Sequence, residues 1–130
     1  MTAFVDTNVL VRHLTGDPPA MAARATAFLT EQPALYLADL IVAETVYVLE
    51  SFFEAPRHQI AAAMRSLVSM RSMVTADPAL LLRAVEVYEV HRLDFAEAYL
   101  VANAERSGVG AVASFDRAVE RMPTVRRVEP

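Results

Sequence analysis

The sequence predicts a doubly wound α/β fold, with a mostly parallel central sheet and helices on both of its faces. Short apolar segments alternate with longer segments of helical periodicity along the whole chain, and strands buried in a parallel sheet are typically continuous apolar runs. The 130 residues also contain no linker, repeat or low-complexity tract. A chain of this length can bury its own core, so we expect a single domain over residues 1–130.

In the first part of the chain, each expected element is bounded by turn-forming or capping residues. The segment TGDPP ends the first helix, Pro33 precedes the second strand, and Asp39 is expected to cap the long helix that follows. The expected elements are a strand over 3–6, helices over 7–14 and 20–32, a strand over 34–37 and a helix over 40–53.

The second part repeats the alternation. Apolar residues at Ile60, Met64 and Leu67 have helical spacing, Asp77 followed by proline is typical of a helix start, and Gly108 of a helix end. The expected elements are a helix over 58–70, a strand over 72–75, helices over 77–91 and 94–107, a strand over 111–114, a helix over 116–122 and a strand over 124–129.

Composition limits the possible functions. The chain has no cysteine, which excludes disulfides, thiolate zinc sites and cysteine nucleophiles. The net charge of -4 argues against a general nucleic-acid-binding surface, although all 12 basic residues are arginine. The start MTAFVDTNVL lacks a basic leader, and no apolar run reaches membrane length. We expect a cytoplasmic protein without membrane contact, whose 55% hydrophobic content is partly covered by a partner.

Carboxylates occur where a doubly wound sheet places its binding crevice, outside the carboxyl ends of the strands. Asp6 and Asp116 follow two of the expected strands, while Glu44, Asp94 and Glu97 lie near helix starts. Several carboxylates in one crevice repel each other and must either take up protons or bind a cation. An all-oxygen set suits Mg²⁺ or Mn²⁺, which points to phosphoryl or phosphodiester chemistry.

Each carboxylate also has a purely structural interpretation. Asp94 and Glu97 have the spacing of a capping box, while Asp6 and Asp116 each precede a helix as an N-cap would. Glu44 fits such an interpretation least well, because it is the only charge in the apolar stretch between residues 40 and 49, where an uncompensated carboxylate is costly.

Four segments, in order, resemble the PIN-domain nucleases. They are FVDTNVLV at the N-terminus, the AE of IVAETVYVL, LDFAEAYLVANAERSG, and VASFD followed by an arginine. Their order and the chain length are similar to those of the VapC-type toxins of bacterial type II toxin–antitoxin systems. The resemblance implies a PIN-like three-layer fold, Mg²⁺- or Mn²⁺-dependent endoribonuclease activity, inhibition by a cognate antitoxin, and a homodimer.

The resemblance also implies a set of metal ligands. Asp6, Glu44 and Asp116 match the acidic positions of the first, second and fourth segments. The third segment usually reads D-F-A-D-A in the family, and Glu97 takes the place of its second aspartate here. Glutamate is one methylene longer than aspartate, so the ligand geometry can differ here. We therefore include Asp94, three residues earlier on the same helical face, as a further candidate ligand.

Neighbouring polar residues are candidates for supporting roles. The hydroxyls of Thr7 and Ser114 are expected to orient the adjacent carboxylates or, equally, to cap local turns. Arg12, His13 and Arg117 are candidates for contacting substrate phosphates.

Two other functions compete with a nuclease. A doubly wound phosphatase that uses a strand-end aspartate usually needs a second aspartate two residues later and a lysine, whereas this chain has Asn8 and no lysine. A non-catalytic interaction module would keep the carboxylates as caps only. Binding of Mn²⁺ by several carboxylates distinguishes an active site from such a module.

Overall fold

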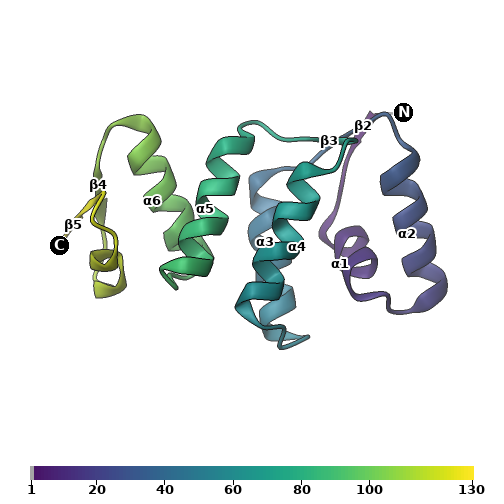
Figure 1. Ribbon diagram of the computed structural model, residues 1–130, viewed down its shortest axis with the longest axis horizontal. Helices are drawn as coiled ribbons and strands as arrows, with labels where there is room; N and C mark the ends of the chain where they lie inside the picture. The colour runs from purple at the N-terminus through teal and green to yellow at the C-terminus, as the bar shows by residue number, and fades with distance from the viewer. Residues whose placement is uncertain (1) are drawn as a thin grey trace. The chain divides into compact units, whose positions relative to one another are not determined.

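The computed structural model describes residues 2–130, and the chain forms two compact units, Met1–Ala76 and Asp77–Pro130 (Figure 1). Both units combine helices with parallel strands, which confirms the predicted α/β class. The strands are divided between a three-stranded sheet in the N-terminal unit and a two-stranded ladder in the C-terminal unit. That the two units make up one domain stays a prediction.

The N-terminal unit alternates strands and helices from β1 to β3. Its elements are β1 (Thr2–Phe4), α1 (Thr7–Thr15), α2 (Pro19–Glu31), β2 (Ala34–Tyr36), α3 (Asp39–Ser51), α4 (Arg57–Ser69) and β3 (Met73–Val74). The strands are parallel in the order β1-β2-β3, with Phe4 opposite Tyr36 and Tyr36 opposite Val74. Because all three strands run the same way, their carboxyl ends lie at one edge of the sheet.

The core of the N-terminal unit forms where α1 packs against α2 and α3, and α4 against α3 and β3 (Figure 1). Each helix contributes apolar residues at helical spacing to this core. The fully buried side chains include Leu10, Leu29, Leu35, Val42, Ile60 and Met64. Burial of each such side chain contributes roughly 1.5–3 kcal/mol, so this core holds Asp6 and the start of α3 in place.

The C-terminal unit is built on a helix pair. Its elements are α5 (Pro78–Val90), α6 (Phe95–Ser107), β4 (Ala111–Ala113), the 3₁₀ helix η1 (Arg117–Arg121) and β5 (Arg126–Val128). Helices α5 and α6 pack closely, and the buried rings of Tyr88 and Phe95 meet edge to face with centroids 5.9 Å apart. Strands β4 and β5 are parallel, with Ala111 opposite Arg126.

Helix ends follow the sequence signals with one exception. Asp77 caps α5 by accepting a hydrogen bond from the Leu80 N–H at 3.2 Å, and Gly108 ends α6 in the left-handed conformation with φ of 79°. The predicted capping role of Asp39 is wrong. Ala38 occupies the N-cap, and Asp39 is the first helical residue of α3, where its charge still favours the helix dipole.

No helix within residues 2–130 combines the length and the apolar character of a membrane-spanning segment.

Candidate functional site

Asp6 is positioned by the connection from β1 to α1. The Val5 N–H still bonds to the Tyr36 carbonyl at 3.0 Å, which extends the pairing with β2 to the residue before Asp6. Asp6 then takes extended backbone angles as the N-cap of α1, and its Oδ1 accepts from the Thr7 N–H at 2.9 Å. The predicted capping interpretation is therefore correct for one oxygen. The side chain is exposed at the carboxyl edge of the sheet.

Glu44 lies on α3 beside the start of α1. The buried Thr7 hydroxyl donates a short hydrogen bond to Glu44 Oε1 and so joins residues 37 positions apart. Glu44 itself is exposed, so the expectation that it is a desolvated charge within an apolar helix is wrong. The apolar neighbours of Glu44 in the sequence point to other faces of α3, as buried Val42 and Val46 show.

A hollow of about 270 Å³ lies over Asp6 and Glu44. Its walls come from α1 and α3, and its lining comprises Asp6, Thr7, Asn8, Val11, Arg12, Glu44 and Val48. We call Asp6 and Glu44 the N-terminal carboxylate pair. With the Thr7 hydroxyl between the two helices, this hollow presents carboxylate oxygens to the solvent.

Asp94 and Glu97 do not form the capping box that their spacing allows. Asp94 is the N-cap of α6 by its backbone, with its carbonyl accepting from the Ala98 N–H at 2.8 Å, but its side chain makes no capping bond. Glu97 Oε2 is buried and has no hydrogen-bond partner among residues 2–130. The capping-box interpretation of this pair is therefore wrong, although Asp94 remains the N-cap residue of α6.

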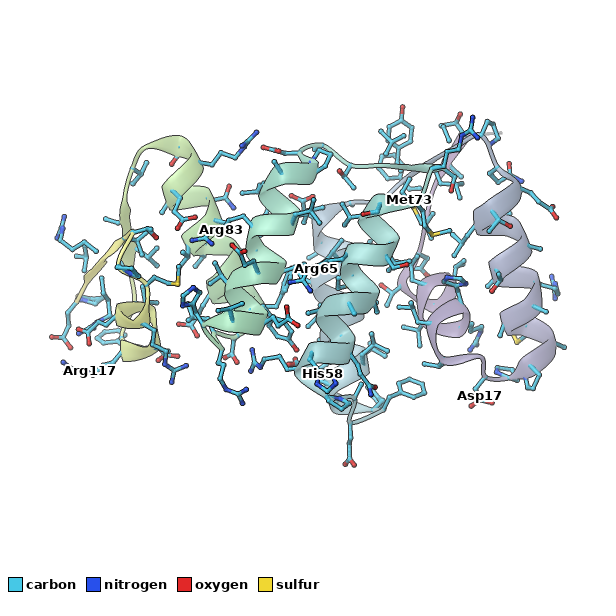
Figure 2. All side chains as sticks on the ribbon, viewed as in Figure 1. Asp17, His58, Arg65, Met73, Arg83 and Arg117 are labelled. Carbon is cyan, nitrogen blue, oxygen red and sulfur yellow. The ribbon has the colours of Figure 1, made fainter. Side chains whose placement is uncertain are left out.

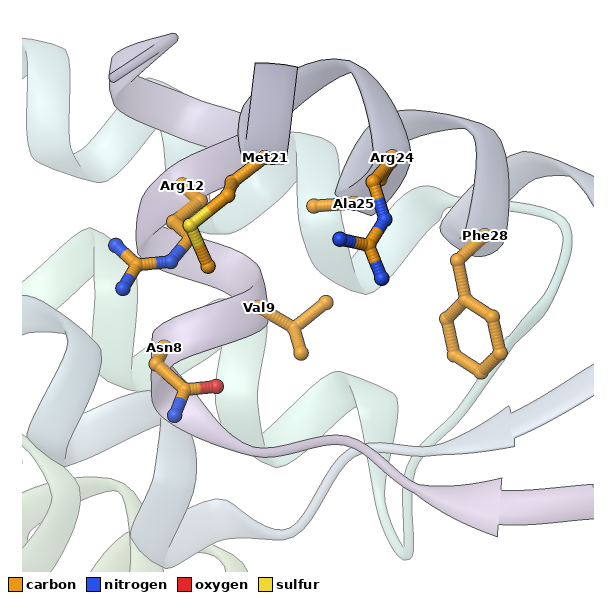
Figure 3. A pocket seen from close by; sticks show the side chains of 7 residues that line it. All are labelled: Asn8, Val9, Arg12, Met21, Arg24, Ala25 and Phe28. Carbon is orange, nitrogen blue, oxygen red and sulfur yellow. The ribbon is translucent and has the colours of Figure 1, made fainter. Parts of the chain in front are cut away.

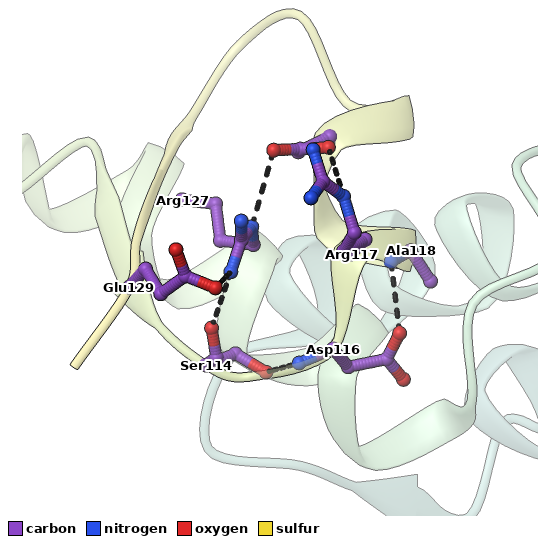
Figure 4. A network of polar contacts seen from close by, with 7 residues as sticks. Ser114, Asp116, Arg117, Ala118, Arg127 and Glu129 are labelled. Atoms are coloured by element: carbon purple, nitrogen blue, oxygen red, sulfur yellow. Dashed lines mark hydrogen bonds and ion pairs between the residues drawn. The ribbon is translucent and has the colours of Figure 1, made fainter.

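Asp116 is held at the turn between β4 and η1 (Figure 4). Its N–H donates to the Ser114 hydroxyl at 2.9 Å, and its Oδ1 caps η1 by accepting from the Ala118 N–H at 2.8 Å. The predicted capping interpretation is correct here, as it is for Asp6. Ser114 thus positions the backbone of Asp116, and the carboxylate remains exposed.

Glu97 and Asp116 interact, and we call them the C-terminal carboxylate pair. Burial, then a hydrogen bond with Asp116 and the charges of Asp116 and Asp94, raise the pKa of Glu97 to about 7, against the charge of Arg121. The Ala118 N–H and the bond with Glu97 lower the pKa of Asp116. Glu97 is therefore the member of the pair that takes up a proton as the pH falls through neutrality, while Asp116 stays ionised.

Two arginines that the sequence analysis did not select lie near the C-terminal pair. The Arg127 side chain is only 6% exposed; it bonds to the Ser114 carbonyl at 2.9 Å and pairs with Glu120 at 3.2 Å (Figure 4). Arg121 donates to the Arg92 carbonyl at 2.9 Å. Both guanidinium charges help to lower the pKa of Asp116. Arg127 could have been selected from the segment TVRRVE, because side chains alternate between the two faces of a strand and one of its two arginines must therefore point inward.

The three residues expected to contact phosphates occupy different environments. Arg12 is half-buried and lines the hollow beside Asp6. His13 instead has its Nδ1 2.7 Å from the Thr26 hydroxyl of α2, and burial lowers its pKa. Arg117 is exposed on η1 and pairs with Glu120 at 3.4 Å (Figures 2 and 4).

The predicted ligands thus gather in two places, one in each unit. The N-terminal unit brings together Asp6, Thr7 and Glu44, and the C-terminal unit brings together Glu97 and Asp116, with Asp94 near enough to act by its charge. No group of three or more histidine, aspartate or glutamate side chains within residues 2–130 is arranged to hold a metal ion.

The sequence matches the PIN domain family over residues 3–125. The chain belongs to the PIN domain family. This match includes all of the carboxylates described above and spans both units of the structure. No curated protein matches the chain.

Two solved structures are similar to this PIN-family chain. The toxin VapC20 of Mycobacterium tuberculosis, described as cleaving the sarcin-ricin loop, is 19% identical with a TM-score of 0.44, over 95% of this chain and 98% of that chain. A chain of VapBC2 from Rickettsia felis, solved with a DNA fragment from its promoter, is 12% identical with a TM-score of 0.39, over 99% and 98%.

Proposed function

We propose that this PIN-family protein is a metal-dependent endoribonuclease and the toxin of a toxin–antitoxin pair. The observation that carries the proposal is the family match over residues 3–125, which contains Asp6, Glu44, Glu97 and Asp116 in the order that the PIN-nuclease resemblance requires. The local geometry supports it, because these residues form two pairs of interacting or adjacent carboxylates rather than four isolated caps.

The proposed metal ligands are Asp6, Glu44, Glu97 and Asp116, with Asp94 as a fifth. The donor set fits a hard divalent cation, Mg²⁺ or Mn²⁺, because it consists of oxygens only. The buried Glu97 Oε2 without a hydrogen-bond partner supports this assignment, since a buried carboxylate oxygen needs either a proton donor or a cation.

When bound, a divalent ion supplies a water of lowered pKa and positive charge for the phosphate oxygens. The chain's own residues orient the ligands. The Thr7 hydroxyl directs one oxygen of Glu44, and the Ser114 hydroxyl fixes the backbone of Asp116. Arg12 beside Asp6 is the best placed of the three proposed phosphate contacts, followed by the exposed Arg117, whereas His13 is engaged with Thr26.

A partner is expected to cover part of the surface. Large apolar side chains are exposed on both units, and they include Phe4, Leu40, Tyr47, Phe52, Val109 and Phe115. Such exposure is typical of interaction surfaces. This exposure supports the proposed binding of a cognate antitoxin and the proposed homodimer. The proposed location of the protein and of its RNA substrate is the cytoplasm.

The test is RNA cleavage by the purified protein with Mg²⁺ or Mn²⁺. We expect products with 5′-phosphate and 3′-hydroxyl ends, no cleavage in EDTA, no cleavage by Asp6→Asn, and strongly reduced cleavage by Glu97→Ala. Asp17→Asn is the matched control, because Asp17 is an exposed aspartate outside both pairs (Figure 2), and it should cleave as the wild type does.

Two results would contradict the proposal. Equal cleavage by the wild type and Asp6→Asn would show a contaminating nuclease or a wrong site. Failure of the wild type to bind Mn²⁺ would favour a non-catalytic interaction module.

A further inference from the structure

A second hollow of about 390 Å³ lies between α1 and α2 (Figure 3). Asn8, Val9 and Arg12 come from α1, while Met21, Arg24, Ala25 and Phe28 come from α2. The side chains of Arg24 and Phe28 stand on the same side of the hollow, one helical turn apart, with Val9 opposite (Figure 3). The hollow therefore combines an apolar floor, an aromatic ring and two guanidinium groups.

Both guanidinium groups are available to a ligand. The ion pairs formed among residues 2–130 leave Arg12 and Arg24 without an acidic partner. By contrast, Arg83, Arg106 and Arg127 of the C-terminal unit each pair with a carboxylate. Two uncompensated guanidinium groups beside one hollow in a protein of net charge -4 favour an anionic ligand.

This hollow lies next to the one that holds the N-terminal carboxylate pair. Asn8 and Arg12 line both hollows. They are four residues apart and so lie on one face of α1, where they form the wall between the two spaces. The two hollows are therefore adjacent, as two consecutive groups of one bound chain molecule would require.

The chemistry of the second hollow fits a nucleotide. Proteins that bind single-stranded nucleic acids without sequence preference use aromatic side chains that stack on the bases and basic side chains that bind the phosphate backbone. Phe28 is half-buried, so its ring is partly held in place and still offers a surface for stacking. Arg24 is exposed on the same helix, so its guanidinium group is free to bind the phosphate of this nucleotide.

We propose that the hollow between α1 and α2 is a subsite for the nucleotide next to the scissile phosphodiester of single-stranded RNA. Phe28 stacks on the base, Arg24 binds its phosphate, and Arg12 lies between this nucleotide and the N-terminal carboxylate pair. This inference rests on the proposed endoribonuclease function, which it extends from the reaction to the recognition of substrate.

The first experiment measures equilibrium binding of a fluorescent single-stranded oligoribonucleotide by anisotropy, in EDTA so that nothing is cleaved. We expect Arg24→Gln and Phe28→Leu each to weaken binding roughly tenfold, and Phe28→Tyr to bind as the wild type does because it keeps the ring. Arg71→Gln is the matched control, since Arg71 is exposed in the same unit and lines neither hollow.

The salt dependence of binding separates the two roles. Each phosphate contact on a single strand contributes about 0.7 to the slope of log affinity against log salt. We expect Arg24→Gln to reduce this slope by about 0.7 and Phe28→Leu to leave it unchanged. Thermal unfolding of each variant identifies any that fail to fold. If Phe28→Leu does not fold, the test rests on Arg24→Gln, because Arg24 is exposed and its side chain is not part of the core.

The outcomes distinguish this inference from the proposed function. Wild-type cleavage of RNA together with unchanged affinity in Arg24→Gln and Phe28→Leu overturns the subsite and leaves the nuclease assignment intact; the hollow then belongs to a protein partner. Loss of affinity in both variants without any metal-dependent cleavage supports RNA binding in this hollow, but it overturns the nuclease and with it the place of the hollow beside a scissile bond. No measurable RNA binding by the wild type also overturns the subsite.

Discussion

The two carboxylate pairs differ in how the protein surrounds them. The N-terminal pair is exposed and is organised by hydrogen bonds from the start of α1 to Asp6 and Glu44. The C-terminal pair is partly buried at Glu97 and lies among arginines, and burial together with Asp116 raises the pKa of Glu97 to about 7. We therefore expect the C-terminal pair to respond to pH near neutrality, while the Thr7 hydroxyl sets the geometry of the N-terminal pair.

The largest expected effect comes from neutralising one member of each pair. Glu97→Gln and Glu44→Gln should each lower metal-dependent RNA cleavage by at least about 100-fold, because a ligand charge is lost. Glu97→Asp should retain activity, since aspartate is the residue common at this position in PIN-domain nucleases. Initial rates at saturating Mn²⁺ give the comparison. A normal rate of cleavage by Glu97→Gln would show that the C-terminal pair does not bind the catalytic metal ion.

A smaller effect is expected at the hydroxyl that orients Glu44. Thr7→Val keeps the shape of the buried side chain but removes the donor to Glu44 Oε1. We expect the Mn²⁺ affinity measured by calorimetry to fall roughly 10-fold, and Thr7→Ser to restore it. Equal affinities in Thr7→Val and the wild type would show that the hydroxyl serves only the folding of α1.

The pH dependence of metal binding tests the contrast between the pairs directly. Because the pKa of Glu97 is raised to about 7, a cation must displace its proton below that pH. Mn²⁺ affinity should therefore fall about fivefold from pH 7 to pH 6 and level off above pH 8.

Calorimetry at pH 6, 7 and 8 measures this dependence, with Glu97→Gln as the control. That variant has no proton to displace at this position, so its weaker affinity should vary less with pH. An identical pH profile for the wild type and Glu97→Gln would place the titrating group elsewhere.

The smallest effect concerns stability of the C-terminal unit rather than its chemistry. Glu105 accepts two hydrogen bonds from Arg83, at 2.8 and 2.9 Å, and the two side chains are 17% and 32% exposed. Glu105→Gln should lower the free energy of unfolding at pH 7 by about 1 kcal/mol. Glu86 is the exposed partner of the same arginine, and Glu86→Gln should lower the free energy of unfolding by only about 0.3 kcal/mol.

The sign of the pH dependence follows from Glu105. Arg83 and the Thr124 hydroxyl hold the pKa of Glu105 below its ordinary value of 4.5. The stabilisation is therefore present above that value and is lost as the pH falls through the lowered pKa of the folded state. The free energies of unfolding of the wild type and Glu105→Gln, measured by chemical denaturation, should converge as the pH falls through the lowered pKa of Glu105, and a constant difference would contradict this account.

Local signals predicted most of the secondary structure. Proline, glycine and aspartate mark the helix ends at Asp77, Gly108 and Asp116, where backbone geometry depends on neighbours in the sequence. Asp39 was the exception, because a capping residue one position off has nearly the same local signature. The parallel pairing followed from the alternation of apolar segments and helices.

Burial and pairing could not be predicted from composition alone. Glu44 occurs in an apolar stretch, but the periodicity of α3 turns it to the solvent while Val42 and Val46 turn inward. Asp94 and Glu97 have capping-box spacing, but the capping bonds are absent and Glu97 interacts with Asp116 instead. In each case, tertiary contacts decided between two interpretations that the spacing allowed.

The sequence by itself determined the α/β class, the order of the elements and which carboxylates follow strands or begin helices, because these depend on periodicity and on contacts within a few residues. Only the tertiary structure decided that Thr7 contacts Glu44, that burial and Asp116 raise the pKa of Glu97, and that Arg12 and Arg24 share a hollow with Phe28. Those properties depend on distance and desolvation between residues far apart in the chain, and packing alone sets both.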